Sequence, residues 1–275
     1  MTGTLLDASA TNGASTGIIE NLRHPAVRRI TDVLRSQTAR PRTILIDDEE
    51  NIAQALRAGL RLLALYATAG YAEAARRLQQ GIPSISLHVL GDEVARSVFG
   101  REKAARLFAL AQAPAPTSWR DLSTRRGDVL VLDGVRIAGN IGAILRSARA
   151  FDTAGIVLID SGLTTVYDRR LIRASRGLVF TIPALITTRT ELARFLRAER
   201  IPLASLSADA GTSLETISRL RGRIAVLLGS ERAGASGELT SIATHRYAVP
   251  MSPDVESLNV SVAAGIALYE RQRSR

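Results

Sequence analysis

Two loops near the end of the chain combine glycine with small polar residues that can surround a bound molecule. The first, from Gly229 to Gly234 (GSERAG), directly follows the apolar run from Ile224 to Leu228. A continuous apolar run of this length predicts a strand buried on both faces. Glycine and serine after such a strand leave backbone N–H groups open to a ligand. An ordinary turn at a sheet edge is the alternative explanation.

The second loop starts at Pro250 and leads into the last helix. It follows a short strand predicted over Arg246 to Val249, and Ser257 is the expected N-cap of a helix from Leu258 to about Arg273. In an open α/β sheet, ligands bind where the strands reach their carboxyl ends. The two loops therefore predict one binding site.

A third segment, from Asp133 to Arg146, also follows an apolar strand and contains three glycines, Gly134, Gly139 and Gly142. A dinucleotide-binding fold would need the spacing G-x-G-x-x-G, whereas these glycines fall as G-x-x-x-x-G-x-x-G. This mismatch argues against a nicotinamide-linked oxidoreductase.

The same segment places Asn140 and Arg146 six residues apart. On a helix, six residues turn through about 600°, roughly 120° away from alignment. We therefore expect Asn140 to act from the helix N-terminus while Arg146 points along the inner face. A surface salt bridge is the alternative role of Arg146.

Composition limits the class of protein. The 275 residues suffice for one large or two small domains, and an apolar content of 46% argues against disorder. The chain has no cysteine, and its three histidines show no ligand spacing, so we expect no disulfide, thiolate nucleophile or metal site. No run reaches the roughly 18 apolar residues of a membrane span, and no signal peptide is apparent. These features predict a cytoplasmic protein.

The net charge of +10, from 36 basic and 26 acidic residues, indicates a polyanionic partner such as nucleic acid. A basic amphipathic helix predicted over residues 18–35 could contact RNA or could be a solvated helix face. The segment from Arg101 to Arg106 is a second candidate for phosphate contact, or a helix with paired charges.

Alternating strand and helix patterns predict two α/β domains. We expect a flexible tail over residues 1–17, a small RNA-binding domain over 18–110, a proline-containing linker over 111–119 and a larger domain over 120–275. The larger domain should contain one parallel sheet covered on both faces, because its strands are apolar throughout. The expected strands of the smaller domain lie at residues 43–46, 62–66 and 84–89.

These segments resemble the motifs of the SPOUT (SpoU/TrmH-type) RNA 2′-O-ribose methyltransferases. The likeness rests on Asn140 and Arg146, on the loop after Gly229, and on the segments 249–251 and 257–263. The resemblance implies a trefoil knot, S-adenosylmethionine as methyl donor, and homodimerisation through the C-terminal domain. It also implies that the smaller domain is similar to kink-turn-binding ribosomal proteins.

The resemblance assigns roles to individual residues. Those expected to bind the cofactor are Gly229, Ser230, Glu231, Val249, Pro250, Met251, Leu258, Asn259 and Ser261. Those expected to be catalytic are Arg146, Asn140, Ser257 and Asn259. Arg146 is the base in the family account, but an arginine hardly ever loses its proton. Its other role is that of a fixed cation that orients phosphate and lowers the pKa of the ribose hydroxyl. The residues expected to bind RNA follow from their position and charge and not from the resemblance: Arg176 and Arg173 at a helix end, and Arg101 and Lys103 in the basic segment described above.

The segments 125–129, 133–144 and 168–177 are most similar to the thiostrepton/nosiheptide-resistance methyltransferases. That subgroup methylates one adenosine ribose in the GTPase-associated centre of 23S rRNA and so blocks thiopeptide binding. A tRNA ribose methyltransferase and a non-catalytic RNA-binding protein are the alternatives.

Overall fold

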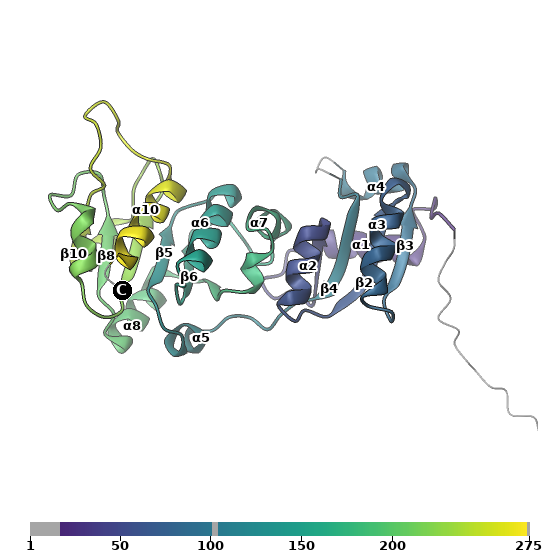
Figure 1. Cartoon of the computed structure of the whole chain (residues 1–275), viewed down its shortest axis with the longest axis horizontal. Helices are drawn as coiled ribbons and strands as arrows, with labels where there is room; N and C mark the ends of the chain where they lie inside the picture. The colour runs from purple at the N-terminus through teal and green to yellow at the C-terminus, as the bar shows by residue number, and fades with distance from the viewer. Residues whose placement is uncertain (1–16, 101–103, 274–275) are drawn as a thin grey trace, which may run out of the picture.

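The computed structural model describes residues 17–100 and 104–273. Two α/β domains follow one another along an elongated molecule (Figure 1). The expected α/β class and two-domain arrangement are confirmed, whereas the tail expected over residues 1–17 lies, except for Gly17, outside the described residues. Within the described ranges, no helix is both long and apolar enough to cross a membrane.

The N-terminal domain contains a four-stranded mixed sheet in the order β1-β4-β2-β3. Strand β4 pairs antiparallel with both β1 and β2, while β2 and β3 are parallel. The strands are β1 (Thr43–Asp47), β2 (Leu62–Thr68), β3 (Ser86–Leu90) and β4 (Leu107–Gln112). The helices are α1 (Pro25–Arg35), α2 (Glu49–Arg57), α3 (Ala72–Gln80) and α4 (Asp92–Phe99), with the 3-10 turn η1 (Ala69–Tyr71).

Three features of this domain differ from the sequence prediction. Helix α1 starts at Pro25 rather than at residue 18, because Ile19 bridges to Leu90 at the edge of the sheet and His24 caps the helix. Helix α4 was not predicted. Strand β4 was also missed, and it extends to Gln112, so the first two residues of the expected linker belong to the sheet.

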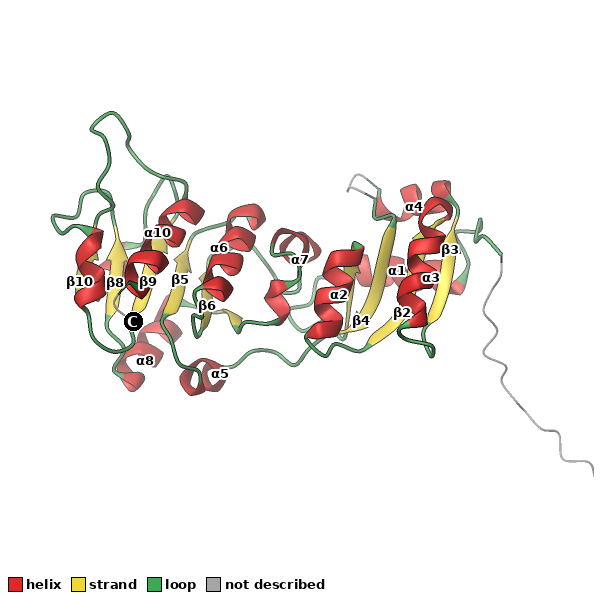
Figure 2. Ribbon diagram, in the orientation of Figure 1, coloured by secondary structure: helices red, strands yellow, loops and turns green. Residues whose placement is uncertain are grey.

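The C-terminal domain contains a six-stranded sheet in the order β10-β8-β9-β5-β6-β7, and all of its pairings are parallel, as predicted. Figure 2 shows helices on both sides of it. The strands are β5 (Val129–Asp133), β6 (Gly155–Ile159), β7 (Ala184–Ile186), β8 (Leu203–Leu206), β9 (Ala225–Gly229) and β10 (His245–Tyr247). The helices are α5 (Trp119–Thr124), α6 (Ala138–Ala150), α7 (Arg169–Ala174), α8 (Arg189–Glu199), α9 (Gly237–Thr240) and α10 (Val260–Gln272), with the 3-10 turns η2 (Leu178–Phe180) and η3 (Leu214–Arg219).

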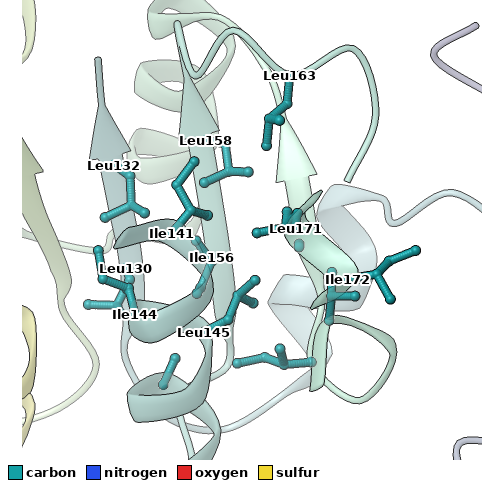
Figure 3. Close-up of a cluster of buried hydrophobic side chains, with 14 of the residues drawn as sticks. Leu130, Leu132, Ile141, Ile144, Leu145, Ile156, Leu158, Leu163, Leu171 and Ile172 are labelled. Carbon is teal, nitrogen blue, oxygen red and sulfur yellow. The ribbon is translucent and has the colours of Figure 1, made fainter. Parts of the chain in front are cut away.

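Alternation along β5 explains the two covered faces. Leu130 and Leu132 point into the core shared with α6, α7 and α10, and the close-up shows them beside Ile141 and Ile144 of α6 (Figure 3). Val129 and Val131 point into the core shared with α8. All four side chains are fully buried. Because both faces of the sheet are buried at β5, every residue of this strand is apolar up to its last residue, Asp133.

The two domains are held together by an ion pair at their boundary. The Arg169 Nε donates to both carboxylate oxygens of Asp47, at 3.0 and 2.8 Å, and the Arg169 guanidinium lies 4.4 Å from the centre of the Phe99 ring. Asp47 and Phe99 belong to the N-terminal domain, and Arg169 starts α7. One apolar core also runs through both domains, from Ile46 to Leu171. The N-terminal domain is therefore fixed beside α7.

The start of the last helix is a further correction. Ser257 does not cap it; instead the Asn259 side chain accepts a hydrogen bond from the Ser261 N–H at 2.9 Å, and α10 begins at Val260. Strand β10 ends at Tyr247, so Val249 lies in the following loop. The knot implied by the resemblance stays a prediction.

Candidate functional site

The loop after β9 is a closed turn that depends on Gly229. Ser230 and Gly234 exchange two backbone hydrogen bonds of 3.0 and 2.9 Å, and the Ala233 N–H donates to the Ser230 hydroxyl at 3.2 Å. A Cβ on Gly229 would lie 1.9 Å from the Ala235 nitrogen, so no larger residue fits there. The turn thus folds back tightly onto the end of its own strand.

Three side chains from three distant segments meet at this loop. The Asn140 amide donates to Glu231 Oε1 at 2.9 Å, and the Asn259 amide donates to the same oxygen at 3.0 Å. The Asn259 amide is also 3.2 Å from the Asn140 Oδ1. The structure therefore brings together one predicted residue from each of the three sequence motifs. We call these residues, Asn140, Glu231 and Asn259, the amide–carboxylate cluster.

Beside the cluster lies a pocket of about 590 Å³ between the loops that follow β8, β9 and β10. Seven of the predicted site residues line it: Gly229, Ser230, Glu231, Val249, Met251, Ser257 and Leu258. Pro250, Asn259 and Ser261 do not line it, although Asn259 bonds to its wall through Glu231. Both predicted loops thus border the same pocket.

One wall of this pocket was missed from the sequence. It is formed by the end of β8 and the residues that follow it, from Ser205 to Asp209. The available signal was that β8 is a parallel neighbour of β9, so its carboxyl end must reach the same edge of the sheet. The Asp209 carboxylate accepts hydrogen bonds from Arg246 and from the Ser207 hydroxyl, and these lower its pKa, the Ser207 bond most strongly.

Arg146 does not line the pocket. It lies on the exposed side of α6, whereas Ile144 and Leu145 are buried, so the expected position along the inner face is wrong. Within residues 17–100 and 104–273, its side chain makes no hydrogen bond or ion pair. Ser257 is an exposed residue of the loop before α10. The structure therefore leaves Arg146 outside the contacts of the amide–carboxylate cluster.

The arginines expected to contact RNA lie at the domain boundary. The Arg173 Nε is 3.5 Å from the Asp47 carboxylate, and the Arg176 Nη1 is 3.5 Å from that of Glu50. Burial raises the pKa of Asp47 above its usual value, although Arg169 and Arg173 act in the opposite direction. The Arg176 side chain remains 60% exposed, which leaves it accessible to a ligand. Arg101 and Lys103 lie outside the described residues.

A buried carboxylate at the end of β5 holds the far side of the Gly229 loop. Asp133 Oδ2 accepts the Ser236 N–H at 2.8 Å, and Asp133 Oδ1 accepts from Arg189 at 2.7 Å. Burial alone would raise the pKa of Asp133, but the bonds from Ser236 and Arg189 outweigh it and lower the pKa. Sequence reasoning missed this role, because Arg189 begins a helix 56 residues further along the chain.

Comparison with known proteins matches both domains. Residues 16–125 match the thiostrepton-resistance methylase N-terminal family, and residues 128–269 match the SpoU rRNA methylase family. A 23S rRNA (adenosine(1067)-2′-O)-methyltransferase from Streptomyces laurentii is 42% identical, over 94% of this chain and 97% of the relative. The protein of the same name from Streptomyces azureus is 38% identical, over 92% and 94% of the two chains.

Solved structures agree with the fold. An RNA 2′-O ribose methyltransferase superposes with a TM-score of 0.77 at 25% identity, covering 94% of this chain and 99% of the other. An AdoMet-bound rRNA methyltransferase from Sinorhizobium meliloti, at 24% identity and a TM-score of 0.76 over 94% and 97% of the two chains, has the same fold. The resemblance inferred from the motifs is confirmed: the chain belongs to the SpoU rRNA methylase family and, within it, groups with the thiostrepton-resistance methylases.

Proposed function

We propose that this protein transfers a methyl group from S-adenosylmethionine to the ribose 2′-hydroxyl of one adenosine in 23S rRNA. The observation that carries the proposal is the amide–carboxylate cluster, in which Asn140, Glu231 and Asn259 meet beside a pocket at the carboxyl edge of the sheet. The relatives from Streptomyces, which match over nearly their whole length, support adenosine in 23S rRNA as the target.

The pocket has the chemistry that an adenosine-containing cofactor requires. Its walls combine apolar side chains, such as Leu258 and Met251, with the backbone of the tight Gly229 loop. Apolar walls can cover the two faces of an adenine, while backbone groups can bond its polar edge. S-adenosylmethionine, when bound, supplies an activated methyl group on a sulfonium. We assign its binding to Gly229, Ser230, Glu231, Val249, Met251 and Leu258, with Pro250, Asn259 and Ser261 as supporting residues.

The residues of the cluster hold one another in place. Glu231 accepts two amide hydrogen bonds on a single oxygen, which leaves both asparagines oriented toward the loop. Asn259 uses its own oxygen to accept bonds from the N–H and the hydroxyl of Ser261, so the cluster is fixed to the start of α10. Such a fixed arrangement can align a ribose hydroxyl for reaction, and alignment alone accounts for much of an enzymatic acceleration.

The ribose hydroxyl must lose its proton when its oxygen gains the methyl group. We assign this step to Arg146, with Ser257 and Asn259 as hydrogen-bonding partners of the ribose. Arg146 can have one of two roles, which the Arg146→Lys variant described in the Discussion separates. It is either a base, or a cation that orients an RNA phosphate and lowers the pKa of the hydroxyl. Arg173 and Arg176, beside the site on α7 and just after it, are assigned to phosphate contacts, as are Arg101 and Lys103.

Homodimerisation is supported by an uncovered apolar face on α10. Val262 and Tyr269, seven residues apart on one side of the helix, are 49% and 57% exposed. The opposite side, with Ala264 and Leu268, is buried against the core. We propose that the uncovered side packs against a second copy, and that a Val262→Asp variant shifts the mass measured by light scattering from dimer to monomer.

The deciding experiment is primer-extension mapping of ribose methylation on 23S rRNA incubated with the protein and S-adenosylmethionine. A single new stop at an adenosine of the GTPase-associated centre is expected, together with resistance to thiopeptides in cells that express the chain. Because the proposed substrate is ribosomal RNA, we propose that the protein acts in the cytoplasm. Methylation of tRNA and not of rRNA would show that the protein is a tRNA ribose methyltransferase. Binding of RNA without methylation would show that it is a non-catalytic RNA-binding protein.

A further inference from the structure

A second hollow, of about 730 Å³, adjoins the cofactor pocket at the Gly229 loop. The two hollows share a wall, because Ser230, Glu231, Gly234 and Val260 line both of them. Asn140 lines only the second one. A molecule in this hollow would therefore touch Asn140 and Glu231 of the amide–carboxylate cluster. We call the second hollow the acceptor cleft.

A network of ion pairs and hydrogen bonds forms the floor of the acceptor cleft. Arg189 bridges two carboxylates, Asp133 at 2.7 Å and Asp160 at 2.5 Å, and its Nε donates to the Ser236 hydroxyl at 2.9 Å. Asp133 is 2% exposed. Because Arg189 is occupied by these carboxylates, it is not free to bind an anion. A negatively charged group is thus disfavoured at the floor.

The rim of the acceptor cleft has the opposite character. Arg136 and Arg232 both line it and both are exposed. The Arg136 Nε donates to the Asp160 carbonyl oxygen at 3.2 Å, which holds the guanidinium at the mouth of the cleft. Asp160 has a left-handed backbone, with φ of 50°, and this directs its carbonyl out of the regular strand pairing. Within the described ranges, the remaining N–H groups of Arg136 and those of Arg232 make no hydrogen bond.

We propose that the base of the target nucleotide enters the acceptor cleft, with its flanking phosphates on Arg136 and Arg232 and its ribose at the shared wall, where Asn259 bonds to Glu231. This inference rests on the proposed function. Cations at the mouth and an internally satisfied, anionic floor suit a ligand whose phosphates stay outside while its uncharged nucleoside enters. The shared wall brings the two sites together: the ribose oxygen must reach the methyl carbon directly, so donor and acceptor have to meet at the edge of the loop that borders both hollows.

The proposal is tested with Arg136→Ala, Arg232→Ala and the double variant, and Arg197→Ala serves as the control. Arg197 is an exposed arginine of α8 that borders a different hollow, so its loss changes net charge equally. The measurements are affinity for a 23S rRNA fragment by fluorescence anisotropy between about 50 and 200 mM salt, the KM for that fragment, and the affinity for S-adenosylmethionine by calorimetry.

Each single variant should bind RNA roughly three- to tenfold more weakly, and should lower the slope of log affinity against log salt by about 0.7–0.9. Affinity for S-adenosylmethionine should be unchanged. The proposal is overturned if the variants have the same salt slope of RNA affinity and the same KM as the Arg197→Ala control. It is also overturned if they lose affinity for S-adenosylmethionine while the salt slope of RNA affinity is unaltered. If the unaltered chain methylates no RNA, the proposed function fails, while the salt slopes still decide whether Arg136 and Arg232 bind phosphate.

Discussion

Glu231 shows how much of the site depends on a single carboxylate oxygen. Its Oε1 accepts the amides of Asn140 and Asn259 and lies 3.5 Å from the Val260 N–H at the start of α10. A carboxylate accepts several donors at once and makes stronger bonds than a neutral amide would. A residue in a loop thereby ties two helix N-termini together. Glu231 also lines both hollows.

Arg146 gives the most direct test of catalysis at the residue scale. Replacing it with Ala should lower kcat by about 10²-fold or more, since losing a positioned proton-transfer or electrostatic group typically costs that much. Binding of S-adenosylmethionine should be unaffected, because Arg146 does not line the cofactor pocket. Single-turnover methylation and calorimetry measure the two effects.

An Arg146→Lys variant separates the two roles of this residue. A lysine amine can lose its proton at high pH, so a base role predicts activity that returns as pH rises. A fixed-cation role predicts partial activity with no such return. Full activity of Arg146→Ala would remove Arg146 from the mechanism.

Asp133 makes the stability of the protein depend on pH. Its folded-state pKa lies below the unfolded value, so its contribution is fully present above the unfolded pKa and is lost as pH falls through the folded pKa. We expect Asp133→Asn to lower the free energy of unfolding by about 1–3 kcal/mol near neutral pH, and by less in acid. Urea unfolding between about pH 3 and 7, the range that spans the usual Asp pKa, measures this.

The exposed Asp152 supplies the control for that measurement, because its carboxylate is 82% accessible and 3.8 Å from Arg149. The free energy of unfolding of Asp152→Asn should differ from that of the unaltered protein by the same amount at every pH. A constant difference between Asp133→Asn and the parent down to the lowest pH would contradict the assigned pKa shift.

At the scale of elements, the packing of α6 against α7 positions the arginines beside the site. Gly142 is the point of closest approach: a Cβ there would lie 2.4 Å from the Ala174 Cβ and 2.7 Å from the Ser175 nitrogen. Arg173 immediately precedes Ala174, and Asn140 lies half a turn before Gly142. The distance between the two helices therefore sets the distance between a cluster residue and a proposed phosphate contact.

Gly142→Ala should force these helices apart. Overpacking of this kind costs about 1–3 kcal/mol of stability, so the urea midpoint should fall and the KM for RNA should rise. Gly139→Ala, in the same helix, is the matched control, since its Cβ would meet only the Ile137 side chain at an ordinary 3.8 Å. Equal free energies of unfolding for the two variants would show that α7 can shift away from α6 without loss of stability.

At the scale of the whole molecule, the pair of Asp47 and Arg169 joins the N-terminal domain to the C-terminal domain. Their side chains are 2% and 10% exposed. Breaking a buried pair by removing one partner is far more destabilising than losing a surface pair, because an uncompensated charge remains.

Arg169→Ala should therefore destabilise the protein by about 3 kcal/mol and separate the unfolding of the two domains. Differential scanning calorimetry should show two transitions in place of one. Arg149→Ala, which breaks only a surface pair at 3.8 Å, should change stability by less than about 1 kcal/mol. A single transition in Arg169→Ala would mean that the shared apolar core alone couples the domains.

Much of the fold could be predicted because its signals are local. The strands β5 and β9 are uninterrupted apolar runs, and each ends in a polar or glycine residue. Strand β4 was missed because the run from Leu107 to Gln112 contains two alanines and no β-branched residue, a composition that favours strands weakly. Its inner place in the sheet, between β1 and β2, buries it. The cap at Asn259 was assigned to Ser257 because both residue types cap helices equally well.

The sequence by itself determined the family, the parallel sheet and the loops that border the pocket, since each depends on residues close together in the chain. Only the tertiary structure decided that Glu231 receives both asparagines, that Arg189 secures Asp133 and that Arg169 joins the domains. These contacts span 28 to 122 residues of sequence. The contacts of Glu231 and Asp133 exist because parallel strands gather their carboxyl ends along one edge, where residues with no shared local pattern become neighbours. The contact of Arg169 with Asp47 exists because α7 packs against β1 of the other domain.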